Sequence, residues 1–271
     1  MIKYIRLIFT CGWYILIKWP KICKMAKNKE KYPITERYNA VRTLILHVLK
    51  HWHIDIHTEG LEQYLNYQGK KLIIMNHLSA IDCLAFIAEC EKPIMFIAKK
   101  EVEKYPFVGK IVKVIDGLFL DRDNLLNQMR TLNQAMKIAK DENGPDVTIF
   151  PEGTRNKVPG TKCLEFKAGT FKIAMKAGIA IFPVAIYGAF RLVPTKYNMK
   201  KFPVQISVLN PILPEEFEKH NSFDFASKCQ NLIDNEILKM REKDLLYLKD
   251  IKMSKKCYSL AIESDLRDFN A

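Results

Sequence analysis

The sequence predicts an α/β fold in which a mostly parallel central sheet is flanked by helices. Two observations predict it: short apolar runs alternate with helical stretches beyond residue 54, and hairpin-turn signals between the runs are few. A chain of 271 residues can bury one large core, and it contains no internal repeat. We therefore divide the chain into an N-terminal helical segment over 1–53, one domain over 54–250 and a C-terminal tail of open role over 251–271.

The N-terminal segment begins with a stretch that predicts a helix lying in a membrane surface. Residues 4–19 are largely apolar and include Trp13 and Trp19, but the uncharged part, 7–17, is shorter than the roughly 20 residues of a membrane span. A signal peptide requires a small-residue cleavage site after its apolar part, and none follows here. Eight Lys or Arg against one Glu in residues 1–31 favour anionic lipid. The alternative is a terminal helix packed on the protein's own core.

A second amphipathic helix is predicted over 34–53, where apolar residues recur at helical spacing. His47 and His51 stand four residues apart in it, and this spacing could hold a metal ion. No Glu or Cys is placed to complete an H-E-x-x-H motif or a Cys/His set. We therefore expect these histidines to be solvated or to lie at an interface, and we expect no metal site.

The remaining elements follow from the alternation beyond residue 54. Helices are expected over 79–90, 124–140 and 167–177. The expected strands are the apolar runs IDIHTEG, KLIIMNH, PIMFIAK, IDGLFLD, VTIFPEG, IAIFPVAI and VQISVL. In folds of this class the chemistry collects on the loops at the strand ends.

The net charge limits which partners the protein can have, and the cysteine content indicates its redox compartment. The formal net charge of +13 favours a phosphate-rich partner, either nucleic acid or an anionic membrane. The seven cysteines are odd in number and contain no C-x-x-C pair. We interpret them as reduced thiols of a cytosolic protein, with neither a disulfide framework nor a zinc cluster.

The stretch NHLSAID, residues 76–82, places polar side chains where a buried strand ends. His77 and Asp82 can meet if the histidine lies in the strand-to-helix loop and the aspartate in the first helical turn. Asp82 would then accept the Nδ1 proton and leave Nε2 to take a proton from a hydroxyl. No G-x-S-x-G surrounds Ser79, so we expect a helix cap or a substrate hydrogen bond there rather than a nucleophile.

Three further unusual blocks stand at later strand ends. They are DGLFLDR at 116–122, IFPEGTRN at 149–156 and IFPVAI at 181–186. Together with NHLSAID, in this order and spacing, they resemble the four sequence blocks of the glycerolipid acyltransferase family. The resemblance covers residues 54–215, and the combination of N-H-x-S-x-x-D with F-P-E-G-T-R is highly specific.

The resemblance implies that His77 and Asp82 are catalytic, as the H-x4-D pair of the family, and that the second and third blocks bind the phosphate of an acyl acceptor. Guanidinium groups suit phosphate because they bind it bidentately. The residues to which we carry this role are Arg122, Glu152, Gly153, Thr154 and Arg155, with Lys99, Lys100 and Lys167 as further basic candidates. Glu152 is expected to orient Arg155 or a glycerol hydroxyl, and backbone amides near Gly153 are expected to stabilise the oxyanion.

Three positions depart from the family pattern. Asp116 stands where the second block usually has glycine, and Gly117 follows it. Asn156 stands where serine is common, and Phe182 where valine is frequent. None of them removes a proposed acid, base or phosphate ligand, so they bear on the acceptor and on chain length rather than on the reaction class.

The resemblance implies an O-acyltransferase of phospholipid biosynthesis. It would transfer an acyl group from an acyl thioester to the sn-2 hydroxyl of 1-acyl-sn-glycerol-3-phosphate, giving phosphatidic acid. Either acyl-CoA or acyl-carrier protein would be the donor, with no cofactor and no metal. We expect a peripheral or monotopic protein on the cytoplasmic face of the cell membrane, without a nucleic-acid partner.

Three alternatives to this activity stay open. The same chemistry could act on glycerol-3-phosphate or another lyso-lipid. A non-enzymatic basic membrane-binding protein would explain the charge but would leave His77 and Asp82 without a purpose. A metal-dependent hydrolase is the third alternative.

Overall fold

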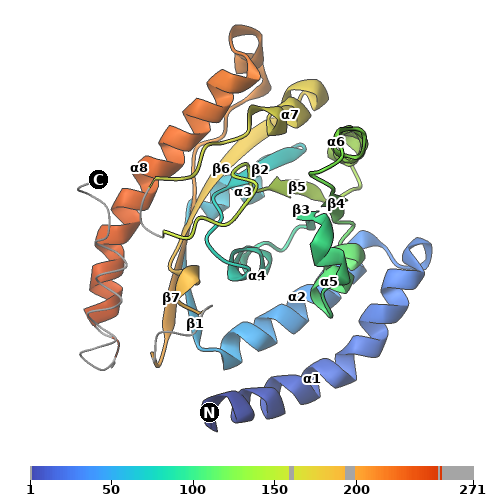
Figure 1. The fold of residues 1–271 in the computed structure, drawn as a ribbon, viewed down its shortest axis with the longest axis vertical. Coiled ribbons are helices and arrows are strands. Elements are labelled where there is room, and N and C mark those ends of the chain that lie inside the picture. The colour runs from blue at the N-terminus through green and yellow to red at the C-terminus, as the bar shows by residue number, and fades with distance from the viewer. Residues whose placement is uncertain (1, 159–161, 193–198, 250, 252–271) are drawn as a thin grey trace.

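The computed structural model describes residues 2–158, 162–192, 199–249 and 251. A seven-stranded sheet in the order β1-β7-β6-β2-β5-β3-β4 runs through the molecule, with helices on both faces (Figure 1). Neighbouring strands are parallel except β6 and β7, which pair antiparallel. The predicted α/β class is confirmed.

The strands coincide with the apolar runs that predicted them. The runs that form the central strands could be recognised because a strand covered on both faces has apolar residues almost throughout. The strands are β1 (Ile54–Glu59), β2 (Lys71–Met75), β3 (Ile94–Lys99), β4 (Leu118–Leu120), β5 (Asp146–Ile149), β6 (Ala180–Tyr187) and β7 (Phe202–Val208).

The helices include all those that the sequence predicted. The α-helices are α1 (Ile2–Lys27), α2 (Ile34–His51), α3 (Leu61–Asn66), α4 (Ile81–Glu89), α5 (Val108–Val114), α6 (Leu125–Lys140), α7 (Lys172–Ala177) and α8 (Ser222–Lys249). Short 3-10 helices are η1 (Lys29–Lys31), η2 (Lys100–Lys104), η3 (Ala168–Thr170), η4 (Ala189–Arg191) and η5 (Pro214–Lys219). The predicted tail lies outside the described residues, apart from residue 251.

The sheet separates two hydrophobic cores. Strand β2 contributes side chains to both, because they alternate between its two faces. Ile73 and Met75 belong to the core beneath α2 and α4. Leu72 and Ile74 belong to the core beneath α6, α7 and α8. Successive side chains of a strand point to opposite faces, so one apolar strand supplies both cores.

Helix α8 lies along β6 and β7, and the sequence reasoning missed it (Figure 1). Its apolar face is interrupted by polar residues that are buried against the sheet. Glu236 accepts a hydrogen bond from the Ser207 hydroxyl at 2.9 Å. Asp244 forms an ion pair with Arg191 in which both side chains are fully buried. These charged positions remove the clean apolar stripe by which an amphipathic helix is recognised.

Helices α1 and α2 pack against each other in antiparallel directions. Lys21 of α1 lies 3.5 Å from Glu36 near the start of α2, while Tyr14 stacks on His47 towards its end. Ile22 and Met25 of α1 are buried. Part of α1 therefore packs on the protein's own core, as the alternative for this segment anticipated. Among the described residues, none of the helices combines the length and hydropathy needed to cross a bilayer.

Asp116, which departs from the family pattern, ties these helices to the domain. It adopts a left-handed φ of 58°, the conformation that glycine adopts without strain. Arg37 of α2 binds both of its carboxylate oxygens, at 2.9 and 2.6 Å, and Lys29 binds one at 2.8 Å. The ion pairs give this aspartate a role that glycine could not have.

Candidate active site

Four strands bring the predicted site residues to one edge of the sheet. Because β2, β5, β3 and β4 are parallel, their carboxyl ends lie at the same edge. His77 follows β2, and Glu152 follows the adjacent β5. Lys100 and Arg122 follow β3 and β4, so they lie further along the same edge.

His77 and Asp82 form the predicted pair. His77 lies in the loop after β2, Asp82 lies in the first turn of α4, and Nδ1 of the imidazole is 2.9 Å from Oδ2 of the carboxylate. An ionised carboxylate can only accept, so Nδ1 is the donor and Nε2 is left with its lone pair. Asp82 is fully buried, whereas the His77 side chain keeps 18% of its exposure. The imidazole of His77 is therefore accessible from outside the protein, whereas the carboxylate of Asp82 is not.

The loop between β2 and α4 is held by its own polar residues. Oδ2 of Asp82 also accepts the backbone N–H groups of Leu78 and Ser79, both at 2.7 Å. The hydroxyl of Ser79 accepts the N–H of Ile81, the first residue of α4. Asn76 exchanges two hydrogen bonds with the backbone of Ile186 in β6, at 3.0 and 2.8 Å. Every polar residue of the first block thus has a contact that fixes where His77 stands.

Two residues of the third block hold His77 from the β5 side, and the sequence reasoning assigned neither. The Phe150 ring stacks on the imidazole with 4.0 Å between centroids. The backbone N–H of Asn156 donates to the His77 carbonyl at 2.7 Å, and the Asn156 side chain accepts the N–H of Val158. The signal that could have found them is the adjacency of the first and third blocks, which depends on the strand order.

Glu152 has a different role from the one predicted. Its side chain is only 4% exposed, and its two oxygens accept the N–H groups of His77 at 2.6 Å and Leu164 at 2.9 Å. The expectation that it orients Arg155 or a glycerol hydroxyl is corrected: both oxygens bind backbone. Glu152 joins the histidine loop to the segment that leads into η3.

Burial raises the pKa of Glu152 to about 7, although the two backbone N–H donors act in the opposite direction. Removal from water favours the neutral carboxyl, whereas the N–H groups favour the anion. The negative charges of Asp82 and Asp234 contribute to the increase. A carboxyl group that titrates near neutral pH therefore contacts the backbone of His77.

The turn after Glu152 requires glycine at its next position. Gly153 has a φ of 72°, and a Cβ there would lie 3.1 Å from Nζ of Lys167. The Gly153 N–H donates to the Phe150 carbonyl at 3.0 Å, so this amide is already used within the turn. Gly153 itself is therefore not the oxyanion donor that we expected in this region.

Arg155 and Thr154 are exposed on the same turn. Burial and the charge of Asp82 raise the pKa of the Cys83 thiol, and the positive charge of Arg155 opposes them. The guanidinium of Arg155 therefore acts electrostatically on the first turn of α4, where Asp82 stands. Cys83 itself packs against the core.

Arg122 and Lys100 form a second basic group further along the edge. Lys100 forms an exposed ion pair with Asp121 at 2.7 Å. Burial lowers the pKa of Arg122, and the negative charge of Glu101 partly offsets this. The structure thus places Arg155 next to Asn156, which contacts the His77 loop between β2 and α4, and Arg122 three strands away, counting from β2 to β4.

The fold and the site place a histidine, hydrogen-bonded to a buried aspartate, at the carboxyl edge of an α/β sheet. The sequence profile of the Acyltransferase family matches residues 54–187, which include this pair and the arginine-bearing blocks. Residues 54–187 therefore match an acyltransferase domain of this family.

The chain is also similar in sequence to individual proteins with named activities. The chain is 32% identical over 169 residues to a protein of Mycoplasma pneumoniae named as a probable 1-acyl-sn-glycerol-3-phosphate acyltransferase, in an alignment covering 58% of this chain and 62% of the relative. It is 28% identical over 177 residues to the 1-acyl-sn-glycerol-3-phosphate acyltransferase of Haemophilus influenzae, covering 64% of this chain and 71% of the relative. The matched region is thus under two thirds of the first relative's length.

A solved structure shows the same fold. The 1-acyl-sn-glycerophosphate acyltransferase of Thermotoga maritima superposes with a TM-score of 0.67 at 22% identity. The superposition covers 88% of this chain and 98% of that chain. It therefore includes helical regions outside the part that the family profile matches.

Proposed function

We propose that the protein transfers an acyl group from a thioester to the sn-2 hydroxyl of 1-acyl-sn-glycerol-3-phosphate, giving phosphatidic acid. The observation that carries the proposal is the 2.9 Å contact between His77 and the buried Asp82, with the other ring nitrogen left for a hydroxyl. The names of the curated relatives support this acceptor.

In the proposed reaction, Nε2 of His77 removes the proton of the sn-2 hydroxyl. The oxygen attacks the thioester carbonyl carbon and forms a tetrahedral oxyanion. When this intermediate collapses, the carbon–sulfur bond breaks, the ester remains on the glycerol, and the imidazolium returns its proton to the thiolate. The substrate alcohol is the nucleophile, so no acyl-enzyme forms. The carboxylate of Asp82 stabilises the imidazolium during the step.

Arg155 is our candidate for the acceptor phosphate, with Arg122 as a second contact. Arg155 is exposed on the turn beside the catalytic loop, and a guanidinium can bind phosphate oxygens bidentately. Arg122 stands on the same edge, and its partly buried position suits a charge that meets an anion. Acyl-CoA and acyl-carrier protein present the same thioester, so we propose either as the donor.

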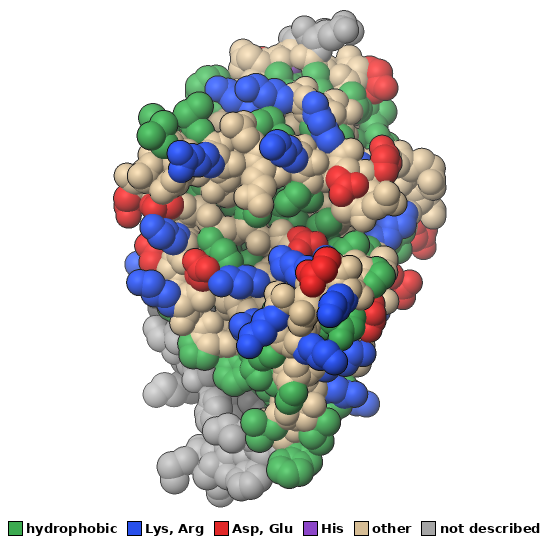
Figure 2. All heavy atoms as spheres, turned by 90° about the vertical axis from the view of Figure 1, so that its right-hand side faces the viewer, with side chains coloured by type: hydrophobic (Ala, Val, Ile, Leu, Met, Phe, Trp, Pro, Cys, Tyr) green, Lys and Arg blue, Asp and Glu red, His purple; other side chains and the backbone are tan. Residues whose placement is uncertain are grey.

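We also propose that α1 attaches the protein to the membrane from which the acceptor is taken. Trp13, Leu16 and Ile17 on α1 are 70%, 64% and 59% exposed, while Ile22 on the same helix is buried against the core. Figure 2 shows the side carrying α1, α5 and α6, where hydrophobic and basic side chains are interspersed. Exposed apolar and aromatic residues beside lysines suit a headgroup region.

The test uses purified protein with 1-acyl-sn-glycerol-3-phosphate and acyl-CoA. We expect release of free thiol together with phosphatidic acid, identified by mass. Parallel reactions with glycerol-3-phosphate and with acyl-carrier protein as donor establish the acceptor and the donor. A chelator should leave the rate unchanged, because no step uses a metal. Thiol release without a new ester would indicate a hydrolase and would contradict the proposal.

A further inference from the structure

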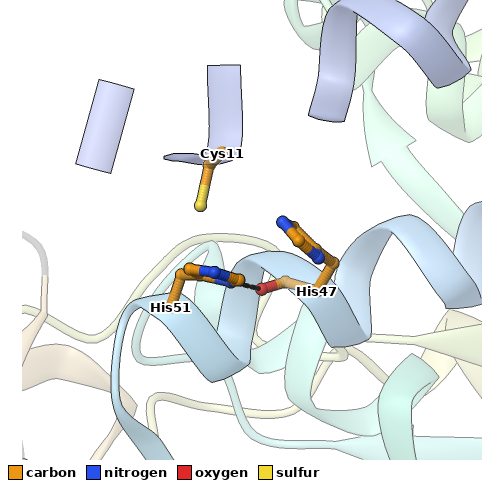
Figure 3. A group of neighbouring side chains, drawn as sticks. All are labelled: Cys11, His47 and His51. Atoms are coloured by element: carbon orange, nitrogen blue, oxygen red, sulfur yellow. Dashed lines mark hydrogen bonds between the residues drawn. The ribbon is translucent and has the colours of Figure 1, made fainter. Parts of the chain in front are cut away.

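Cys11 of α1 lies against two histidines of α2, although these residues are far apart in the sequence. The sulfur of Cys11 and one ring nitrogen each of His47 and His51 all lie within 4.8 Å of one another. Figure 3 shows the Cys11 side chain pointing from α1 towards the two imidazoles. The three residues belong to neither of the elements that carry His77 and Asp82.

The hydrogen bond of His51 prepares one of its nitrogens for a ligand. Nδ1 of His51 lies 2.8 Å from the backbone carbonyl of His47, which can only accept, so Nδ1 carries the proton. The lone pair is then on Nε2. A metal-binding histidine typically has this arrangement, in which one ring nitrogen donates to a carbonyl and the other binds the ion.

The positions of the other two donors are fixed by packing. His47 stacks on Tyr14 with 3.8 Å between the ring centroids, and Tyr14 lies one helical turn from Cys11 on the same helix. Cys11 is 5% exposed and both histidines are partly buried. A partly dehydrated site with one sulfur and two imidazole nitrogens has the ligand set that favours Zn²⁺ over the hard cations Mg²⁺ and Ca²⁺.

We propose that Cys11, His47 and His51 bind a divalent transition metal of the zinc class, which connects α1 to α2. Tetrahedral zinc places neighbouring donor atoms about 3.5 Å apart, so side-chain adjustments of about 1 Å complete the geometry. Cys11 releases its thiol proton to solvent on binding, and water occupies the fourth position.

The site has a consequence for the N-terminal helix. At one end of the helix pair, Lys21 and Glu36 form only an exposed ion pair. The metal would add a cross-link near the other end, close to the exposed Trp13. Metal binding would thus fix α1 on α2 and hold the proposed membrane-facing side chains in one orientation. The metal has no part in acyl transfer.

The test titrates the full-length protein with Co²⁺, whose spectrum reports its ligands. We expect one Co²⁺ per chain, intense visible bands of tetrahedral coordination and a thiolate-to-metal charge-transfer band, all removed by stoichiometric Zn²⁺. Loss of a second-shell partner alone typically costs 10–100-fold in metal affinity, so Cys11→Ser should lower the affinity by at least about 100-fold. Cys23→Ser, on the same helix but outside the cluster, is the matched control.

The histidine variants retain local packing. His47→Phe keeps a ring on Tyr14, and His51→Gln keeps a side chain of similar polarity; each should lose the tetrahedral spectrum. Hydrogen exchange of α1 backbone amides should slow when Zn²⁺ is added to the wild type and not when it is added to Cys11→Ser. Absence of a charge-transfer band in the wild type, or unchanged Co²⁺ affinity in Cys11→Ser, would overturn the site. Both outcomes are independent of acyltransferase activity.

Discussion

At the scale of single residues, His77 is held by four neighbours. Asp82 binds Nδ1, and Phe150 stacks on the ring. Glu152 accepts its backbone N–H, and Asn156 donates to its carbonyl. If His77 is the base, as we propose, it loses little conformational freedom when substrate binds, which is how preorganised catalytic groups act.

Glu152 gives a prediction on pH and stability. Its folded-state pKa is about 7, against an ordinary value of 4.5. Between these pH values the unfolded state loses the proton first, so the stability contributed by this group decreases as pH rises. Glu152→Gln cannot titrate. The unfolding free energy of wild type minus that of the variant should therefore fall by roughly 3 kcal/mol between pH 4.5 and 7.

Urea denaturation of both proteins at a series of pH values measures this difference. Groups that titrate alike in the two proteins cancel in the subtraction. A difference that stays constant across the interval would show that the carboxyl titrates normally, and the burial argument would fail.

Arg155 gives a prediction on the acceptor. Arg155→Ala should raise the KM for the lyso-lipid by about 10–100-fold, because a charge-assisted bidentate contact is lost, with little change in the donor KM. Arg155→Lys should restore only part of the affinity for the lyso-lipid, since lysine lacks the planar guanidinium group that binds phosphate bidentately. Arg122→Ala should be milder because β4 lies three strands from β2. Steady-state kinetics with each substrate varied in turn provide the measurement.

Lys157→Ala is the matched control for Arg155, since Lys157 is another exposed basic residue of the same loop. It should behave as wild type. An increase confined to the donor KM in Arg155→Ala would reverse the assignment of the anion site.

How much of the site the sequence predicts depends on how local each contact is. The His77–Asp82 pair could be predicted because both residues lie within one strand–loop–helix connection. The stacking of Phe150 on His77 could not, since it requires β5 to lie next to β2. The role of Glu152 was missed for the same reason. Its two hydrogen-bond partners are backbone groups, which leave no signal in residue identity.

At the scale of elements, the same distinction separates what was predicted from what was missed. The strands were recognised because both faces of the sheet are covered, as β2 illustrates with its fully buried residues. Helix α8 was missed because Asp244 and Glu236 interrupt its apolar face, and the partners that stabilise them on the buried side lie on η4 and β7. The antiparallel pairing of β7 with β6 likewise could not be predicted, because the hydrophobic periodicity of a strand does not indicate the direction in which the chain returns after a long connection.

The link between α2 and the β4 region gives a prediction on stability. Arg37 is 5% exposed and binds Asp116 through its two terminal guanidinium nitrogens. Arg37→Ala leaves this carboxylate at a left-handed position without its main partner. We expect a loss of roughly 2–4 kcal/mol in unfolding free energy, less than for a fully buried pair because Asp116 is partly exposed.

Lys21→Ala is the control, because it breaks an exposed pair between α1 and α2 and should cost less than about 1 kcal/mol. Chemical denaturation measures both variants. Equal stability of Arg37→Ala and wild type would contradict the role that we assign to Asp116.

At the scale of the whole molecule, the N-terminal helices and the edge of the sheet that carries His77 belong to one packed unit. Helix α2 packs on α4, and α4 begins with the loop that carries His77. Helix α1 lies outside α2 (Figure 1). Its apolar side chains include both buried and exposed ones. Helix α1 thus packs on the core and also presents an apolar surface, which combines the two interpretations of residues 1–31.

The exposed apolar residues of α1 give a prediction on membrane attachment. Replacing Trp13, Leu16 and Ile17 by Ser should abolish binding to anionic vesicles in a sedimentation assay while the fold persists, since these side chains are exposed. Leu246→Ser is the control: this leucine is 60% exposed on α8. Higher salt should weaken wild-type binding by screening the lysines. Sedimentation of the triple variant at the wild-type level would contradict the proposed anchor.

The central claim is that His77, oriented by Asp82, is the base that deprotonates the acyl acceptor, and a double-mutant cycle tests it most directly. Turnover is measured for wild type, His77→Ala, Asp82→Ala and the double variant with 1-acyl-sn-glycerol-3-phosphate and acyl-CoA, after circular dichroism has verified folding. We expect His77→Ala to lower turnover by roughly 10²–10⁴ and the double variant to be little worse, because the two side chains act as one unit. Full activity of His77→Ala, or losses that simply add, would contradict the account.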